Sequence, residues 1–156
     1  MRRAVSRADS FMVDTSVLIE YIVEEAPCRG MAERLLEMAS TGEVELHLNP
    51  VTLSETLYIA SRIYEASGIK DPNGEAINYL NWIRGMVRLS EIGEETAVRA
   101  GELKKELRIA LADCYVIAAS EELGVTPLFA RPEREMKPIL KRMKGLGVKF
   151  LEEVTL

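Results

Sequence analysis

The sequence is poor in cysteine and histidine, which narrows the chemistry that it can support. Its 156 residues include two cysteines and one histidine. Cys28 and Cys114 show neither CxxC pairing nor metal-ligand spacing, so we expect free thiols in a reducing compartment. His47 alternates with apolar residues in a strand-like pattern and is assigned no function. Because no serine or cysteine has a histidine base and an acid at a recognisable spacing, the sequence argues against a triad hydrolase.

Long apolar runs and glycine-rich phosphate loops are also missing. No apolar run reaches the ~18 residues that would suggest a membrane-spanning helix. Arg2 and Arg3 could imitate the charged start of a secretory signal, but Ser6, Arg7 and Asp9 interrupt the apolar region that should follow. Neither a P-loop nor a dinucleotide-binding glycine pattern occurs. We therefore predict a cytoplasmic protein without either type of phosphate loop.

An excess of basic residues is missing too. The chain has 20 basic and 25 acidic residues, and its formal net charge of -5 argues at first sight against a nucleic-acid partner. The segment 131–144 has the opposite balance, with six basic and two acidic residues. Its basic members, which could contact phosphates or form a solvated helix face, are Arg131, Arg134, Lys137, Lys141, Arg142 and Lys144. The overall negative charge therefore does not exclude nucleic acid.

The sequence does contain a regular alternation of short apolar strands and amphipathic helices. We predict strands at 10–13, 44–48, 87–89, 125–129 and 148–151, and helices at 16–25, 29–40, 51–67, 75–86, 94–107, 109–123 and 135–144. This order predicts an α/β fold, in which helices cover both faces of a central parallel sheet, and a single domain over residues 1–156. Ligands of such folds bind at the carboxyl ends of the strands.

Three acidic residues fall where the predicted fold places ligands. Asp14 follows the first strand, Glu55 lies near the start of the helix after the second strand, and Asp113 lies among apolar residues. Two of them have structural alternatives, because Asp14 could cap the next helix and Glu55 could form a capping box with Thr52. A charge among the apolar neighbours of Asp113 is costly unless it is paired, protonated or bound to a metal.

If these carboxylates converge, they need a cation or shared protons. Two carboxylates about 4 Å apart repel by roughly 4 kcal/mol at an effective dielectric constant near 20. Oxygen-rich carboxylate sites suit Mg2+ or Mn2+, which often complete their coordination with substrate phosphates. The acids therefore predict a hydrolytic metal site.

Three motifs resemble the PIN domain family: MVDTSVLIEYI near the start, LSETLYIA in the middle and ALADCYVIAAS late in the chain. The similarity extends over nearly the whole chain, and the layout resembles the VapC-type toxin ribonucleases of VapBC toxin–antitoxin systems, including archaeal members. The resemblance implies an α/β/α sandwich whose acidic pocket holds Mg2+ or Mn2+ for phosphodiester hydrolysis. Asp14, Glu55 and Asp113 match the family acids, and Thr15 matches a hydroxyl residue that often follows the first acid.

The fourth acidic position departs from the family pattern. PIN domains usually have a T-x-D-type motif after the fourth strand, whereas this chain reads LFARPEREM, with Pro132 in the place of the aspartate. Glu133 is the nearest substitute, and Glu135 is the second. Either glutamate could instead be a solvated partner of Arg131 or Arg134. The two arginines could also support the site or its substrate.

The resemblance implies a metal-dependent ribonuclease, in particular the toxin of a toxin–antitoxin pair. Asp14 and Asp113 would be direct or water-mediated metal ligands, Glu55 would complete the shell or orient the attacking water, and Glu133 would be the fourth catalytic acid. The implied partners are an RNA substrate, an antitoxin protein and a second copy in a homodimer. An RNA-processing or quality-control nuclease and a degenerate scaffold that binds protein are the alternatives.

Four large aromatic residues recur at helical spacing, namely Tyr58, Tyr64, Tyr79 and Trp82. This spacing predicts core packing. The family resemblance also makes Tyr58 and Trp82 candidates for a dimer or antitoxin surface.

Overall fold

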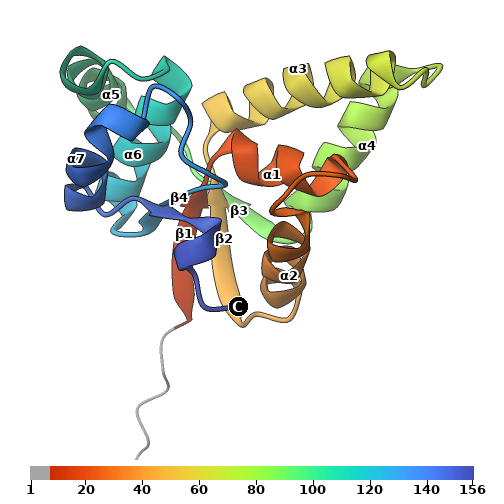
Figure 1. Ribbon diagram of the computed structural model, residues 1–156, viewed down its shortest axis with the longest axis horizontal. Helices are drawn as coiled ribbons and strands as arrows, with labels where there is room; N and C mark the ends of the chain where they lie inside the picture. Colours follow the sequence, from red (N-terminus) through yellow and green to blue (C-terminus); the bar gives the residue numbers. More distant parts are fainter. Residues whose placement is uncertain (1–7) are drawn as a thin grey trace, which may run out of the picture.

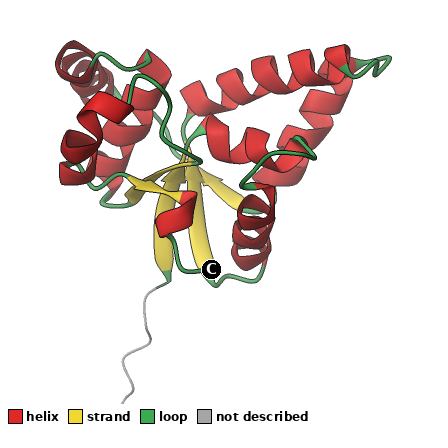
Figure 2. Cartoon of the chain, in the orientation of Figure 1, coloured by secondary structure: helices red, strands yellow, loops and turns green. Residues whose placement is uncertain are grey.

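A parallel sheet of five strands forms the centre of the computed structural model, which describes residues 8–156 (Figure 1, Figure 2). Its strands are β1 (Asp9–Val13), β2 (Val44–Leu48), β3 (Val87–Leu89), β4 (Thr126–Phe129) and β5 (Lys149–Phe150). They lie in the order β3-β2-β1-β4-β5, and every neighbouring pair is parallel. The predicted central parallel sheet is therefore confirmed.

Helices cover both faces of this sheet. On one side lie α1 (Thr15–Ile22), α2 (Arg29–Ser40), α3 (Pro50–Ala66) and α4 (Pro72–Arg84), and on the other lie α5 (Glu94–Leu107), α6 (Leu111–Leu123) and α7 (Leu140–Gly145) (Figure 1). This arrangement is the predicted α/β/α sandwich.

Across residues 8–156, no helix combines the length and the apolarity that crossing a membrane requires. Arg2, Arg3, Ser6 and Arg7, which bear on the predicted absence of a secretory signal, lie outside the described residues.

Alternation along β1 divides the apolar core into two layers. Phe11 and Val13 pack with residues of α1 and α2, whereas Met12 between them packs with residues of α5 and α6. Successive residues of a strand point to opposite faces of the sheet, so the pattern in the sequence assigns each side chain to its layer. The strand ends at Asp14, which therefore emerges at the junction of the two helical layers.

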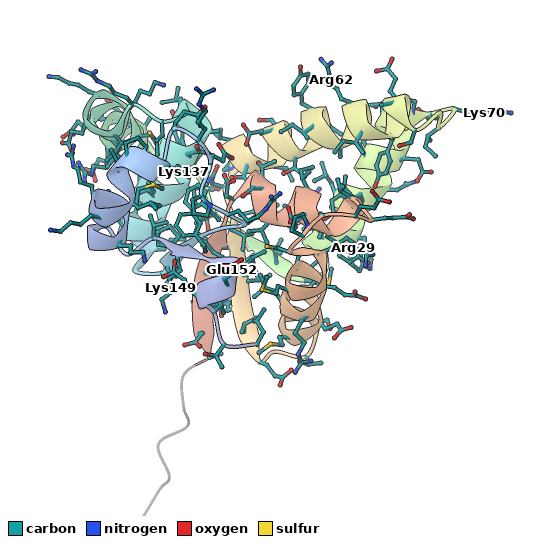
Figure 3. The ribbon with its side chains drawn as sticks, in the orientation of Figure 1. Arg29, Arg62, Lys70, Lys137, Lys149 and Glu152 are labelled. Carbon is teal, nitrogen blue, oxygen red and sulfur yellow. The ribbon has the colours of Figure 1, made fainter. Side chains whose placement is uncertain are left out.

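α3 and α4 pack against each other as an arm that extends from the sheet (Figure 1). Figure 3 shows Arg62 projecting from the outer side of α3 and Lys70 from the loop at the tip of this arm. At its base, α3 contacts both α1 and α6. The base of the arm thus lies over the edge of the sheet where Asp14 emerges.

Two helix starts differ from the prediction because Asx–Pro pairs begin helices here. α4 starts at Pro72, and not at residue 75, since Asp71 Oδ1 accepts a hydrogen bond of 3.0 Å from the N–H of Gly74. α3 is capped by Asn49 and starts at Pro50, so the predicted capping box of Thr52 with Glu55 is wrong. Proline suits the first helical position because its missing N–H would have no partner there.

The helix predicted at 135–144 is shorter and begins later. A single 3-10 turn, Lys137–Ile139, precedes α7, which covers Leu140–Gly145. Pro138 explains the difference, since it lacks a backbone N–H and restricts the residue before it. The helix predicted at 16–25 likewise ends early, at Ile22.

The aromatic residues are divided between core and surface. Tyr79 is buried, and its hydroxyl donates to the Leu18 carbonyl at 2.6 Å. Core packing is wrong for Tyr58, which is 59% exposed and accepts a hydrogen bond from Arg62, and for Trp82, which is 47% exposed. Helical spacing indicates which residues share a helix. It does not show which face of that helix its neighbours cover.

Candidate functional site

Asp14 is held at the carboxyl end of β1 as the N-cap of α1. Its Oδ2 accepts a hydrogen bond of 2.9 Å from the N–H of Ser16, and its own N–H donates to the Leu128 carbonyl of β4 at 2.9 Å. The predicted capping role is therefore confirmed. The other oxygen, Oδ1, is buried and has no hydrogen-bond partner among residues 8–156. One carboxylate oxygen thus stabilises the helix, and the other remains for a ligand.

Asp113 is buried in the first turn of α6, where its charge is disfavoured. Its pKa is raised to about 8, first by burial and then by repulsion from Asp14, Glu133, Glu55 and Glu135. Burial also raises the pKa of Asp14 to about 6, with smaller contributions from Glu55 and Glu133, although the hydrogen bonds from Ser16 oppose this shift. A positive charge beside these two carboxyl groups would favour their ionised forms.

The remaining predicted acids approach from two other elements. Glu55 lies half-buried on α3, whereas Glu133 and Glu135 are exposed in the segment after β4. The pKa of Glu133 is raised by partial desolvation and by repulsion from Glu135 and Glu55. The acids are therefore within electrostatic range of one another. As placed, no three Asp, Glu, His or Cys side chains in the described part of the chain are grouped closely enough to hold a metal ion.

A layer of buried hydroxyl and amide groups joins α1 to α3. Thr15 Oγ1 donates to the Thr52 carbonyl at 3.5 Å and accepts from Thr56 Oγ1 at 3.4 Å. Asn49 Oδ1 accepts from the N–H groups of Val51 and Thr52 at 2.9 and 3.0 Å. Asn49 Nδ2 and Thr52 Oγ1 are buried without a partner in residues 8–156. This layer fixes the start of α3, one turn before Glu55.

A hollow of about 390 Å3 is lined by α1 and the segment 130–135, which includes Glu133 and Glu135 but not the two buried aspartates. Ser16 Oγ accepts from the Ala130 N–H at 3.0 Å, which ties α1 to the end of β4. Glu20, four residues after Ser16, is buried and forms an ion pair with Arg131 at 3.2 Å. We did not predict a role for Ser16 or Glu20 from the sequence. The sequence did contain one signal for Glu20, because it is the single acid among the mostly apolar residues of α1.

The basic segment 131–144 is partly neutralised by the fold. Three of its residues form ion pairs, namely Arg131 with Glu20, Arg142 with Glu106 and Lys144 with Glu153. Arg134, Lys137 and Lys141 form none with the residues that the structure describes. The segment therefore offers less free positive charge than its composition predicts.

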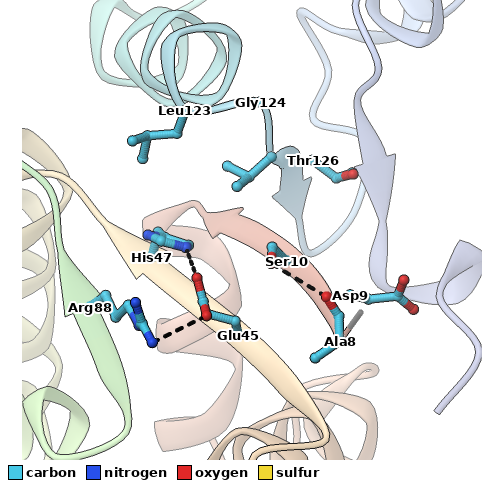
Figure 4. A pocket seen from close by; sticks show the side chains of 10 residues that line it. Ala8, Asp9, Ser10, Glu45, His47, Arg88, Leu123, Gly124 and Thr126 are labelled. Carbon is cyan, nitrogen blue, oxygen red and sulfur yellow. Dashed lines mark hydrogen bonds and ion pairs between the residues drawn. The ribbon is translucent and has the colours of Figure 1, made fainter. Parts of the chain in front are cut away.

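A larger hollow, of about 540 Å3, lies away from these acids, at the amino ends of β1 and β4 (Figure 4). Glu45 links its neighbours there, with Oε1 2.7 Å from His47 Nε2 and Oε2 3.4 Å from an Arg88 nitrogen. None of the predicted site acids lines it. The expectation that His47 serves the strand face agrees with its place in β2.

An aromatic surface lies on α1 and α4. The ring of Trp82 stacks on Tyr21 with centroids 5.2 Å apart, and Tyr79 lies 6.2 Å from Trp82. Tyr21 and Trp82 line a hollow of about 300 Å3 that also contains Glu33 and Glu37 of α2. Half-exposed aromatic rings beside acidic groups are suited to a partner that carries apolar and basic side chains.

The sequence model of the PIN domain matches residues 11–132. Comparison with curated proteins gives no match.

The chain is also similar to chains in several solved structures. One is a toxin–antitoxin complex from Klebsiella pneumoniae, at 17% identity, a TM-score of 0.61 and coverage of 92% of this chain and 98% of that one. A second is DNA-bound VapBC from Salmonella typhimurium, at 14% identity, a TM-score of 0.62 and coverage of 91% and 96%. A third is VapC20 from Mycobacterium tuberculosis, described as a Sarcin-Ricin loop cleaving toxin, at 17% identity, a TM-score of 0.58 and coverage of 74% and 85%. At these identities the likeness establishes a shared fold.

Proposed function

Because this chain belongs to the PIN domain family, we propose that it is a Mg2+- or Mn2+-dependent endoribonuclease and the toxin of a toxin–antitoxin pair. The observation that carries the proposal is the pair of buried aspartates, Asp14 and Asp113, whose pKa values are raised to about 6 and about 8. Strongly perturbed acids at the carboxyl edge of a parallel sheet are typical of an active site.

The donor chemistry of the residues present suits a divalent cation, but the side chains would have to move closer together to hold one. All candidate ligands are carboxylate oxygens, which are the donors that Mg2+ and Mn2+ prefer. Asp14 Oδ1 is buried and unpartnered within residues 8–156, so it can bind a cation without losing a hydrogen bond. Asp14, Asp113 and Glu55 would hold the ion. Glu133 would act as the fourth acid in place of the aspartate that Pro132 replaces.

A bound ion would supply Lewis acidity and lower the pKa of water for attack on a phosphodiester. The chain's own contribution is orientation. The cap to Ser16 fixes Asp14, the threonine layer fixes the helix that carries Glu55, and the first turn of α6 fixes Asp113. Ionisation of Asp113 has to accompany cation binding, because a protonated carboxyl is a poor ligand.

The partners proposed for this chain are an RNA substrate, an antitoxin and a second copy. Solved neighbours are toxin–antitoxin complexes, which supports an antitoxin partner. The exposed Tyr58 and Trp82 are candidates for the surfaces that such partners cover. The two buried free thiols, Cys28 and Cys114, suit the reducing cytoplasm, which is the compartment that we propose.

Two alternatives remain distinct from a toxin. An RNA-processing or quality-control nuclease would use the same acids. An antitoxin gene immediately upstream of the gene for this chain would favour the toxin over such a nuclease. A non-catalytic scaffold that binds protein is favoured by Pro132 at the fourth acidic position. Such a scaffold would have no need of a bound cation.

Cleavage of single-stranded RNA by the purified chain tests the proposal. We expect cleavage with Mn2+ or Mg2+, none with EDTA, and a loss of at least about a hundredfold in Asp113→Asn. Glu121→Gln, which breaks an ion pair between α5 and α6, is the matched control and should cleave normally. Full activity of Asp113→Asn would show that the assigned site is wrong, and binding of RNA or protein without any cleavage would favour the scaffold.

A further inference from the structure

A half-buried ion pair borders the hollow that Glu133 and Glu135 also line. The Glu20 side chain is 6% exposed, whereas that of its partner Arg131 is 50% exposed. Glu20 Oε2 accepts from Arg131 at 3.2 Å, and Glu20 Oε1 accepts from the backbone N–H of Cys28 at 2.8 Å. Both carboxylate oxygens are engaged, so the carboxylate has a fixed orientation.

Stability alone does not account for this pair. Burying a carboxylate costs desolvation energy, and replacing a buried ion pair by packed apolar side chains is often neutral or stabilising. What Glu20 provides is an anchor for one guanidinium group. An arginine that is already oriented loses less side-chain freedom when it binds a ligand, so its affinity for that ligand is higher.

Arg131 lines the same hollow as Glu133, which is the proposed fourth acid. Glu20, Arg131 and Glu133 line the same hollow, together with Ser16, whose N–H binds Asp14. The salt bridge uses one of the five N–H donors of the guanidinium. Across residues 8–156, no second hydrogen bond of Arg131 is found.

We infer that Glu20 is a positioning residue, which holds the Arg131 guanidinium at the edge of the acidic site, where it binds a phosphate of the RNA backbone. This inference rests on the proposed function. The planar fork of a guanidinium matches a phosphate group, and the acids of the site repel the same phosphate. The free N–H donors of the Arg131 guanidinium offset part of this repulsion, although the ion pair with Glu20 reduces its net positive charge. Arg134 borders the same hollow but has no ion pair in the described residues to orient it.

The test uses the full chain and a single-stranded RNA oligonucleotide that the wild type cleaves with Mn2+. Arg131→Met removes the charge and should raise KM about tenfold while kcat falls less than about threefold, because the contact is made in both ground and transition states. In the Asp113→Asn background, Arg131→Met should also lower the slope of log K for RNA binding against log salt by about 0.7, as expected for one phosphate contact. Arg131→Lys should restore the salt slope but only part of the affinity.

Glu20→Gln keeps the acceptor for the Cys28 N–H and removes the charge that orients Arg131. It should raise KM about threefold, and the double variant Glu20→Gln/Arg131→Met should be no worse than Arg131→Met alone, since Glu20 acts through Arg131. Thermal unfolding checks that each variant folds, including Arg131→Met, which leaves the buried Glu20 carboxylate without its ion-pair partner. Glu121→Gln is again the control, because its ion pair with Arg99 joins α5 to α6 and does not border the hollow.

The outcomes separate this inference from the proposed function. If the wild type cleaves RNA while Arg131→Met keeps its KM and its salt slope, the inference is overturned and the proposed function stands. Effects of Glu20→Gln and Arg131→Met that multiply in the double variant would also overturn it. A wild type that cleaves no RNA with either metal overturns the proposed function and this inference together.

Discussion

Replacing Asp113 by asparagine should stabilise the fold at neutral and alkaline pH in the absence of divalent ions. The pKa of this carboxyl rises from 3.8 to about 8 on folding, so the folded chain binds the proton more tightly than the unfolded chain. The free energy of unfolding is therefore highest below about pH 4 and falls as the pH rises towards 8. Asparagine keeps the shape of the side chain and removes the ionisation that causes this fall.

The size of the effect follows from the shift. Each pKa unit corresponds to about 1.4 kcal/mol, which gives an upper limit of about 4 kcal/mol at pH 7. Relaxation and water entry around a charged carboxylate reduce this limit, so we expect roughly 2–3 kcal/mol. Asp14, whose pKa is about 6, adds a smaller loss of stability between about pH 4 and 6 that should persist in Asp113→Asn.

Urea unfolding in EDTA at pH 5, 7 and 8, followed by circular dichroism, measures these free energies. Wild type should lose stability across this range, whereas Asp113→Asn should lose much less and exceed wild type at pH 8. Glu121→Gln, which alters an exposed ion pair, should parallel the wild type. Parallel curves for wild type and Asp113→Asn, or a less stable Asp113→Asn at pH 8, would refute the electrostatic reasoning.

Three other predictions use simpler readouts. Mg2+ at pH 8 should raise the melting temperature of the wild type by several degrees but not that of Asp14→Asn, because the ion binds the folded acidic site; equal shifts would count against that site. Asn49→Ala removes the cap of α3 and should cost about 1–2 kcal/mol in urea unfolding, whereas a change below a few tenths would show that the cap is dispensable. Tyr79→Phe removes the 2.6 Å hydrogen bond to the Leu18 carbonyl and should cost about 1 kcal/mol by the same method, with no loss expected if water replaces the bond.

The fold could be predicted because its signals are local. In β1, the residues Phe11 and Val13 face one helical layer and Met12 the other, as strand alternation requires. Gly124 ends α6 in a left-handed conformation, as a glycine after a helix predicts. The predicted helix boundaries were wrong where a proline altered the start of a helix, as at Pro72 and Pro138.

The site could be predicted only in part, because its support comes from residues far apart in the sequence. Asp14 and Asp113 were predictable from their positions beside a strand end and among apolar neighbours. The pairing of Glu20 with Arg131 joins positions 111 residues apart, and no local pattern specifies it. The hydrogen bond of Thr15 with Thr56 likewise depends on how α3 crosses α1.

Calorimetric titration of the purified chain with Mn2+ at pH 7, in two buffers of different ionisation enthalpy, tests the central claim most directly. Asp113, with a pKa of about 8, is mostly protonated at this pH, and Asp14, with a pKa of about 6, is mostly ionised. We therefore predict that binding releases about one proton per site and that Asp14→Asn and Asp113→Asn weaken it strongly. RNA cleavage should appear over the same range of Mn2+ concentration. Absence of binding, or binding that is equally tight in both variants, would contradict an acidic metal site at this edge of the sheet.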